Sequence, residues 1–310
     1  MKRWIYVLLG IDVGGTKTSI VLADEDFKIF KKSVFDTKPE EGFGEFFKRL
    51  IDFSRKMLEN KPPQAIGVSI GGPLDAEKGI IFNPPHLPWG KVNLKKSLED
   101  VFKCPVRIEH DAKACALAEW KFGAGRGCKN MIFLTLGTGL GAGIIIDGKI
   151  YRGSTGLAGE VGHIRIAEKG PVVYGKAGSW EAFCSGKGIA KLAHFMFPEV
   201  FGENVTTKEI SEKAFKGDEH AIRVLKESGK YLGLGISILI DIFNPDAVVL
   251  GNLSWRLPRF WLDRALEVIE KESLENTRKV CRIVRNELKD KLGDIAALIV
   301  AESAWKKVKY

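Results

Sequence analysis

Residues 8–23, which read LLGIDVGGTKTSIVLA, decide the fold of this 310-residue chain. The apolar run at residues 5–11 predicts a buried strand, and residues 19–23 predict a second strand after a turn rich in glycine. The apolar run is short and leads into the turn without a small-residue cleavage site, unlike a secretory signal peptide. We therefore expect a cytoplasmic protein whose first strand opens an α/β domain.

The turn between these two strands carries the groups that phosphate and magnesium require. Gly14 and Gly15 let the backbone turn tightly and expose peptide N–H groups that can surround phosphate oxygens. Asp12, at the end of the first strand, can hold Mg²⁺ through water, and Thr16 and Lys17 add polar contacts. Short glycine motifs also occur in ordinary hairpins, which is the alternative interpretation of this motif taken alone.

The second half of the chain repeats the same pattern. Residues 130–136 predict a strand, residues 136–143 (LGTGLGAG) a glycine turn and residues 142–147 another strand. Two such turns suit a triphosphate held from both sides, and a third turn after an apolar strand suits a nucleoside. Two related domains with a ligand cleft between them would produce this repetition. The predicted nucleotide-binding residues of this half are Gly137, Thr138, Gly139, Gly141, Gly251 and Asn252.

Hydrophobic periodicity predicts the helices and strands of the rest of the chain. Helices are predicted at residues 40–60, 112–122, 221–243 and 294–307, and strands at residues 29–35, 65–70, 106–109 and 247–250. The stretch before Cys184 is predicted to be irregular. We expect one domain at residues 1–113, with a terminal helix at about 294–310 packing back on it, and a second domain at residues 114–293.

Two further groups of residues carry chemistry. Asp111 stands between a predicted strand and a predicted helix, where it is either a helix N-cap or a base for an attacking hydroxyl. The segment GLAGEVGH, residues 156–163, presents Glu160 and His163 on a glycine-rich loop, and Glu181 follows it. Carboxylates that accept hydrogen bonds from neighbouring hydroxyls are suited to holding a sugar.

Composition excludes several classes of protein. With 45% hydrophobic and 28% charged residues the chain is neither disordered nor membrane-spanning. Five scattered cysteines form no C-x-x-C pair, so we expect neither a disulfide framework nor a cysteine-clustered zinc site. The net charge of +9 is spread along the chain rather than gathered in a stripe, so we expect no nucleic-acid partner.

Together these motifs resemble the ROK family (repressor, open reading frame, kinase) of sugar kinases and sugar-responsive repressors. The resemblance runs from about residue 5 to residue 303 and rests on D-x-G-G-T-K, G-T-G-x-G-A-G and L-A-G-E-V-G-H in the family's order and spacing. It implies a two-domain α/β fold of the actin/hexokinase type (ribonuclease H-like) with an interdomain cleft. It also implies phosphorylation of a hexose on its 6-hydroxyl with MgATP, and a homodimer.

The resemblance also implies roles for individual residues. Asp111 is the expected catalytic base, and Glu160, His163 and Glu181 are expected to hold sugar hydroxyls. Gly72 is expected in the loop that lines the sugar pocket.

The chain departs from the family pattern at several positions. The family's zinc-binding cysteines are replaced by Val172, Tyr174 and Ser179, so we predict no zinc site and expect apolar packing to hold the loop. Histidines replace asparagines at two sugar-contacting positions, His86 and His110. The alternative for His86 is that it points into solvent. Lys113 replaces a further asparagine; it either lowers the pKa of Asp111, contacts phosphate or points outward.

The sequence leaves two alternatives open. A catalytically weak sugar-binding sensor of the same family would retain the pocket without the reaction. A kinase using polyphosphate instead of ATP would keep the reaction and change the donor. The repressors of the family carry a helix-turn-helix domain before the first strand; since the glycine motif begins at residue 10, we expect none here.

Overall fold

A computed structural model describes residues 7–59 and 61–307, and these residues form two compact units. Unit 1 contains the described residues up to Lys121, residues 149–158 and those from Asp290 onward; unit 2 contains residues 122–148 and 159–289. The predicted division between residues 113 and 114 falls inside a helix that stays with unit 1 as far as Lys121. In the described ranges, no helix is both long and apolar enough to cross a bilayer.

Unit 1 is built on a five-stranded sheet with the order β3-β2-β1-β4-β8. Strand β1 pairs in parallel with β4, and β4 pairs in parallel with β8, whereas β2 and β3 are antiparallel to their neighbours. The carboxyl ends of three parallel strands therefore meet at one edge, where ligands of open α/β sheets bind. The strands are β1 (Leu8–Val13), β2 (Lys17–Ala23), β3 (Ile29–Asp36), β4 (Ala65–Ile70) and β8 (Val106–His110).

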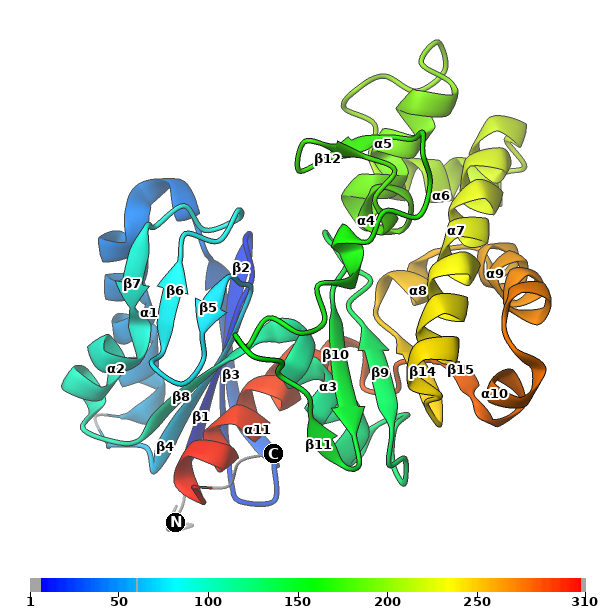
Figure 1. Cartoon of the computed structure of the whole chain (residues 1–310). Helices are drawn as coiled ribbons and strands as arrows, with labels where there is room; N and C mark the ends of the chain where they lie inside the picture. Colours follow the sequence, from blue (N-terminus) through cyan, green and yellow to red (C-terminus); the bar gives the residue numbers. More distant parts are fainter. Residues whose placement is uncertain (1–6, 60, 308–310) are drawn as a thin grey trace. The chain divides into compact units, whose positions relative to one another are not determined.

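The two faces of strand β1 alternate, as the two-residue period of a strand requires. Leu9, Ile11 and Val13 join the apolar core that includes helix α1 (Gly42–Leu58). Gly10 faces the terminal helix α11 (Leu292–Trp305), which packs on β1 and β4 (Figure 1). Asp12 lies on the same face as Gly10, so its carboxylate points toward α11.

Helix α11 packs directly against the backbone of β4. A Cβ added to Gly67 would lie 2.1 Å from the amide nitrogen of Ala301 and 2.2 Å from the carbonyl oxygen of Ala297, so only glycine allows this approach. The remaining elements of unit 1 are η1 (Pro39–Glu41), β5 (Leu74–Asp75), β6 (Ile80–Phe82), β7 (Lys91–Asn93), α2 (Leu94–Phe102), β11 (Lys149–Ile150) and helix α3 (Asp111–Phe122), whose last residue belongs to unit 2.

Unit 2 also contains a sheet, in which β10, β9, β14 and β15 are neighbours in that order. Strands β9 (Met131–Leu134) and β10 (Ala142–Ile146) form the antiparallel hairpin that carries the second glycine turn. Strand β14 (Ala247–Leu250) is parallel both to β9 and to β15 (Arg282–Arg285). Unit 2 thus repeats the strand, glycine turn, strand arrangement of unit 1.

Helices pack into a second core beside this sheet. The long helix α7 (Glu219–Phe243) lies against α9 (Arg259–Glu272) and α4 (Trp180–Cys184). At Gly235 an added Cβ would lie 2.0 Å from the indole ring of Trp180, so the buried tryptophan occupies the space of the absent side chain. The remaining elements are η2 (Val161–His163), β12 (Val172–Val173), β13 (Lys176–Ala177), α5 (Gly186–Met196), α6 (Thr207–Phe215), α8 (Leu253–Arg256), α10 (Glu275–Val280) and η3 (Lys289–Lys291), which runs from unit 2 into unit 1.

The predicted elements agree closely with those observed. The α/β class is confirmed, and strands 65–70 and 247–250 are found at the predicted bounds. The first strand, β1, begins at Leu8. It ends at Val13, two residues beyond the predicted end at Ile11, because its pairing with β2 continues to Val13. Ile5 and Asn60, where a strand was predicted to begin and a helix to end, lie outside the described residues.

Candidate functional site

Unit 1 gathers its predicted site residues at the carboxyl ends of β1, β4 and β8. Asp12 lies near the end of β1, Gly71 and Gly72 follow β4, and Asp111 follows β8 directly. A Cβ on Gly72 would lie 2.7 Å from the His110 ring, and a Cβ on Gly71 would lie 4.0 Å from the Asp111 carboxylate. The parallel sheet thus places Asp12 and Asp111, which are 99 residues apart in sequence, in one cluster.

The carboxylate of Asp12 is desolvated and lies near other charged groups. Burial raises the pKa of Asp12 to about 6, and the charges of Asp111 and Asp294 also raise it. The nearby Ser69 hydroxyl and the charge of Lys32 oppose this shift. A bound cation would relieve the repulsion among these carboxylates.

Helix α11 fixes the place of the Asp12 carboxylate. A Cβ on Gly293, in the first turn of α11, would lie 2.1 Å from Oδ2 of Asp12. The peptide N–H groups of this first turn form the positive end of the helix dipole, which favours a carboxylate beside it. Asp12 therefore lies in a space that a glycine at residue 293 leaves open.

Asp111 is an accessible carboxylate of the cluster, with 46% of its side chain exposed. Burial alone would raise the pKa of Asp111. The charge and hydrogen bond of His110 lower it, and so do the hydrogen bond from the Ala112 amide and the charge of Lys113. Together these groups bring the pKa of Asp111 below its usual range. Nδ1 of His110 lies 3.0 Å from Oδ1 of Asp111, and the Ala112 amide lies 2.6 Å from that oxygen. Asp111 is therefore ionised at neutral pH and can accept a proton.

The positions of Lys113 and His86 bear on alternatives that the sequence leaves open. Lys113 is only 1% exposed, so the prediction that it points outward is wrong, and its charge lowers the pKa of Asp111. His86 is exposed, yet its Cβ lies against the glycine turn, 3.0 Å from a Cβ added at Gly15. The imidazole thus stands next to the predicted phosphate-binding turn.

The first glycine turn is a tight, hydrogen-bonded loop. The amide of Gly14 donates to the carbonyl of Lys17 over 3.0 Å, and the hydroxyl of Thr37 donates to the carbonyl of Gly14 over 2.7 Å. Gly14, Gly15, Thr16 and Lys17 are all exposed. This turn is available to an anionic ligand.

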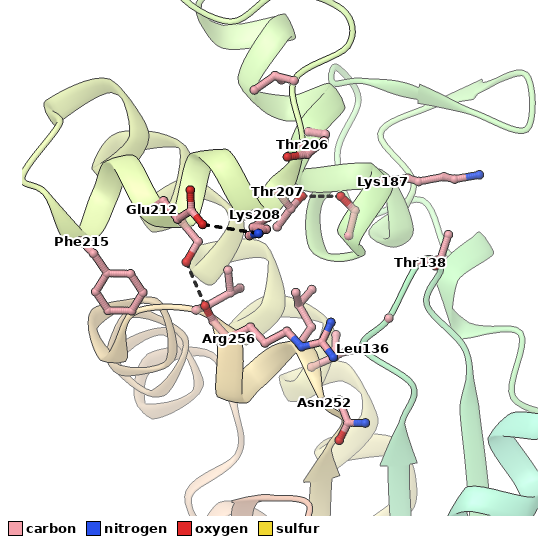
Figure 2. A pocket seen from close by; sticks show the side chains of 17 residues that line it. Leu136, Thr138, Lys187, Thr206, Thr207, Lys208, Glu212, Phe215, Asn252 and Arg256 are labelled. Carbon is pink, nitrogen blue, oxygen red and sulfur yellow. Dashed lines mark hydrogen bonds and ion pairs between the residues drawn. The ribbon is translucent and has the colours of Figure 1, made fainter. Parts of the chain in front are cut away.

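In unit 2, residues of the second and third glycine turns line one cavity of about 920 Å³ (Figure 2). Gly137 and Thr138 come from the β9–β10 hairpin, and Asn252 comes from the start of α8. Cavities of several hundred Å³ with a largely apolar lining are typical of sites for small organic ligands. Because residues of both turns line the same cavity, the cavity supports the prediction that the second and third glycine turns bind the same ligand.

Several residues of this cavity were not identified from the sequence. Figure 2 shows Arg256 near Leu136, and Lys208 and Glu212 on helix α6. The capping box of Thr206 and Glu209 predicts where α6 begins, but no local motif indicates that this helix borders a pocket. The newly found lining residues with polar or aromatic groups are Lys187, Thr206, Thr207, Lys208, Ser211, Glu212, Phe215 and Arg256.

Glu160, His163 and Glu181 come from the loop before β12 and from α4. Glu160 and His163 are exposed, whereas Glu181 is only 9% exposed. The Leu140 amide donates to Oε2 of Glu181 over 2.9 Å. A Cβ on Gly139 would lie 3.1 Å from this oxygen, and one on Gly162 would lie 3.2 Å from it. Glu181 therefore links the second glycine turn to the GEVGH loop.

The donor sets differ in their suitability for metals. Asp12, with its raised pKa among other carboxylates, fits an outer-sphere Mg²⁺ ligand. Val172, Tyr174 and Ser179 do not fit a zinc site, because a valine has no donor atom and the other two lack a thiolate. Within the described part of the chain, no group of three or more His, Cys, Asp or Glu side chains is arranged for a metal ion.

Comparison with known proteins agrees with this arrangement. The ROK family model matches residues 8–304. The chain is 33% identical over 267 residues to a glucokinase of Halalkalibacterium halodurans, covering 81% of this chain and 80% of that protein. It is 30% identical over 310 residues to a xylose repressor of Caldicellulosiruptor bescii, covering 94% of this chain and 78% of that protein.

A solved structure is also similar over nearly the whole chain. It is a ROK family glucokinase from Streptomyces griseus in complex with glucose and AMPPNP, with a TM-score of 0.81 and 29% identity, covering 96% of this chain and 99% of that one. The fold is therefore that of actin/hexokinase-type α/β proteins, as predicted. The chain belongs to the ROK family, whose matched members include both sugar kinases and sugar-responsive repressors.

Proposed function

We propose that this protein is an ATP- and Mg²⁺-dependent sugar kinase that phosphorylates a hexose, glucose-like or N-acetylhexosamine, on its 6-hydroxyl. The observation that carries the proposal is the pairing of two differently tuned carboxylates. Asp111 is ionised and accessible, whereas Asp12 has a raised pKa and lies among other negative charges. Pairs of acidic groups with separated pKa values are typical of sites that divide two chemical roles.

In this proposal Asp111 takes the proton of the attacking sugar hydroxyl. General-base assistance of this kind contributes about 10²- to 10⁴-fold to the rate. Mg²⁺ held through Asp12 would supply charge neutralisation at the transferring phosphoryl group. Glu160, His163 and Glu181, with Gly72, His86 and His110, would hold the sugar.

The nucleotide would use both glycine turns and the cavity of unit 2. The first glycine turn is exposed from Gly14 to Lys17, and Gly137 and Thr138 of the second turn are exposed, so the phosphates would lie against these two turns. The cavity of about 920 Å³ is lined by Thr138, Asn252 and Arg256 among others, and it would bind the nucleoside. Polyphosphate has no nucleoside, so the cavity favours ATP as the donor.

The test is a coupled ADP-release assay over a panel of hexoses and N-acetylhexosamines. Asp111→Asn should lower kcat at least about 10²-fold while sugar binding, measured by calorimetry, stays within threefold. The matched control is Asp75→Asn, which changes a partly exposed carboxylate at the end of β5, outside the cluster. An Asp111→Asn enzyme with wild-type kcat would remove Asp111 from the mechanism.

A sugar-binding regulator is the second candidate, favoured by the similarity to the xylose repressor. It predicts calorimetric sugar binding without ADP release from any sugar in the panel. Replacing ATP with polyphosphate in the same assay tests the alternative donor.

A further inference from the structure

The hairpin of β12 and β13 has an unusual residue at its tip. Val172 pairs with Ala177 and Val173 with Lys176, so Tyr174 and Gly175 form a two-residue loop. Both residues have positive φ, 53° for Tyr174 and 69° for Gly175. Loops of this kind prefer Asn-Gly, because a bulky residue at left-handed φ is strained by about 1 kcal/mol or more. A tyrosine at this position needs a compensating interaction.

The compensating interaction is with His163. The ring of Tyr174 stacks on the imidazole of His163, with centroids 4.9 Å apart and an angle of 20° between the planes. Lys176, on the other side of the same loop, donates a hydrogen bond from Nζ to the carbonyl of His163. One hairpin tip thus holds both the ring and the backbone of this histidine.

Tyr174 also lies near a second member of the candidate sugar site. Burial and the neighbouring charges of Glu181 and Glu160 raise the pKa of Tyr174. The Leu140 amide holds the Glu181 carboxylate in place. One aromatic side chain therefore stacks on His163 and lies near Glu181.

The hairpin itself is secured without a metal. Nζ of Lys191 donates to the carbonyl of Val172 over 2.9 Å, and the amide of Gly178 donates to the carbonyl of Pro171 over 3.3 Å. The positions that would supply zinc ligands are occupied by side chains that do not fit zinc. The tip is therefore held in place by hydrogen bonds and ring stacking.

We propose that Tyr174 is a positioning residue that orients His163 and Glu181 toward the sugar, and that it does so in a loop that binds no zinc. The proposal rests on the sugar-kinase function proposed above. Stacking restricts rotation of the imidazole, so that a ring nitrogen is presented to a hydroxyl before the sugar arrives. Preorganisation of this kind lowers the entropy lost on binding.

The test compares Tyr174→Asn with Tyr174→Phe. Asparagine suits the left-handed turn but removes the ring, so the melting temperature should be unchanged or higher. The KM of Tyr174→Asn for the sugar should rise about tenfold, which corresponds to the upper range of the energy of an aromatic contact. Its kcat and its KM for ATP should stay within twofold of the wild-type values. Phenylalanine keeps the stack and loses the hydroxyl, so the KM should rise by a smaller factor. Val172→Thr, on the same hairpin and exposed, is the matched control and should change nothing.

Failure of this inference is separable from failure of the kinase function. Nuclear magnetic resonance of the histidine side chains, with His163 assigned through His163→Gln, needs no activity. Tyr174→Asn should shift the His163 ring signals and Val172→Thr should not. A wild-type KM and unshifted His163 signals in Tyr174→Asn would overturn the inference, as would stoichiometric zinc in protein purified without added metal.

Discussion

Replacement of Gly293 by alanine would drive a methyl group into the Asp12 carboxylate. The new Cβ would lie 2.1 Å from Oδ2, whereas real Cβ contacts are practically never shorter than 3.0 Å. The carboxylate must therefore move by about 0.9 Å or more. Because the obstructing atom is the end of a side chain rather than backbone, Asp12 can rotate away while α11 stays in place.

The expected result is loss of activity with little loss of stability. A displacement of about 1 Å in a positioned group lowers the rate by about 10²-fold. The Mg²⁺ concentration needed for half-maximal activity should also rise, since Asp12 is the proposed ligand. Alanine is a better helix former than glycine by about 1 kcal/mol, which offsets part of any strain in the fold.

Gly44→Ala is the matched control. Gly44 also lies in the first turn of a helix of unit 1, and an added Cβ there has no neighbour within 4 Å. Both variants should have similar melting temperatures, and Gly44→Ala should retain wild-type kcat. If Gly293→Ala keeps kcat and Mg²⁺ activation within twofold of wild type, the position of Asp12 is not important for the reaction.

Three further substitutions test the electrostatics and packing of unit 1. Asp12→Asn should remove a pH dependence of stability: the pKa of Asp12 is raised from 3.8 to about 6, so its favourable contribution is complete below pH 4 and is lost as the pH rises through 6. Without metal, the variant should therefore melt higher than wild type at pH 8, and an equal gain at pH 4 would contradict this. Gly67→Ala should destabilise unit 1 by about 3 kcal/mol in denaturant unfolding, because the methyl group would meet the backbone of α11; a wild-type midpoint would argue against that packing. Arg152→Ala should lower the free energy of unfolding by about 3 kcal/mol, since Glu109 is 3% exposed and its Oε2 lies 2.5 Å from the Arg152 guanidinium. If Glu109→Gln restores the stability in the double variant, the loss is due to the charge that Arg152→Ala leaves buried without this partner.

Patterns local in sequence were sufficient to predict the strands and the glycine turns. Strand β4 is a short, fully buried segment between prolines and glycines, and both of its ends are as predicted. The pairing of β4 with β1 and β8 follows from the tertiary fold, and it is this pairing that places Asp111 near Asp12. Periodicity alone contains no information on which strand ends meet.

The parts of the site that the sequence did not reveal depend on distant contacts. Arg256 lines the unit 2 cavity because α8 and α6 pack around it, and no spacing within either helix indicates this. Gly293 is an ordinary helical glycine in the sequence, and only the approach of Asp12 gives it a role. Tyr174 was expected to pack with other apolar side chains of its loop, whereas its ring contacts His163.

The distinction between kinase and regulator depends on Asp12 and Asp111 rather than on the sugar-binding residues. A regulator needs groups that recognise hydroxyls, which Glu160, His163 and Glu181 supply, but it gains nothing from a strained cluster of carboxylates. Holding Asp12 among Asp111 and Asp294 opposes folding at neutral pH unless a cation is bound. Selection for binding alone would favour the removal of such a charge, because most proteins have little stability to spare. The presence of both carboxylates therefore supports a protein that uses a cation and a base. An Asp12→Asn protein that is stabler than wild type without metal, binds sugar normally and releases no ADP in the presence of Mg²⁺ would demonstrate that Asp12 lowers stability and supports the reaction.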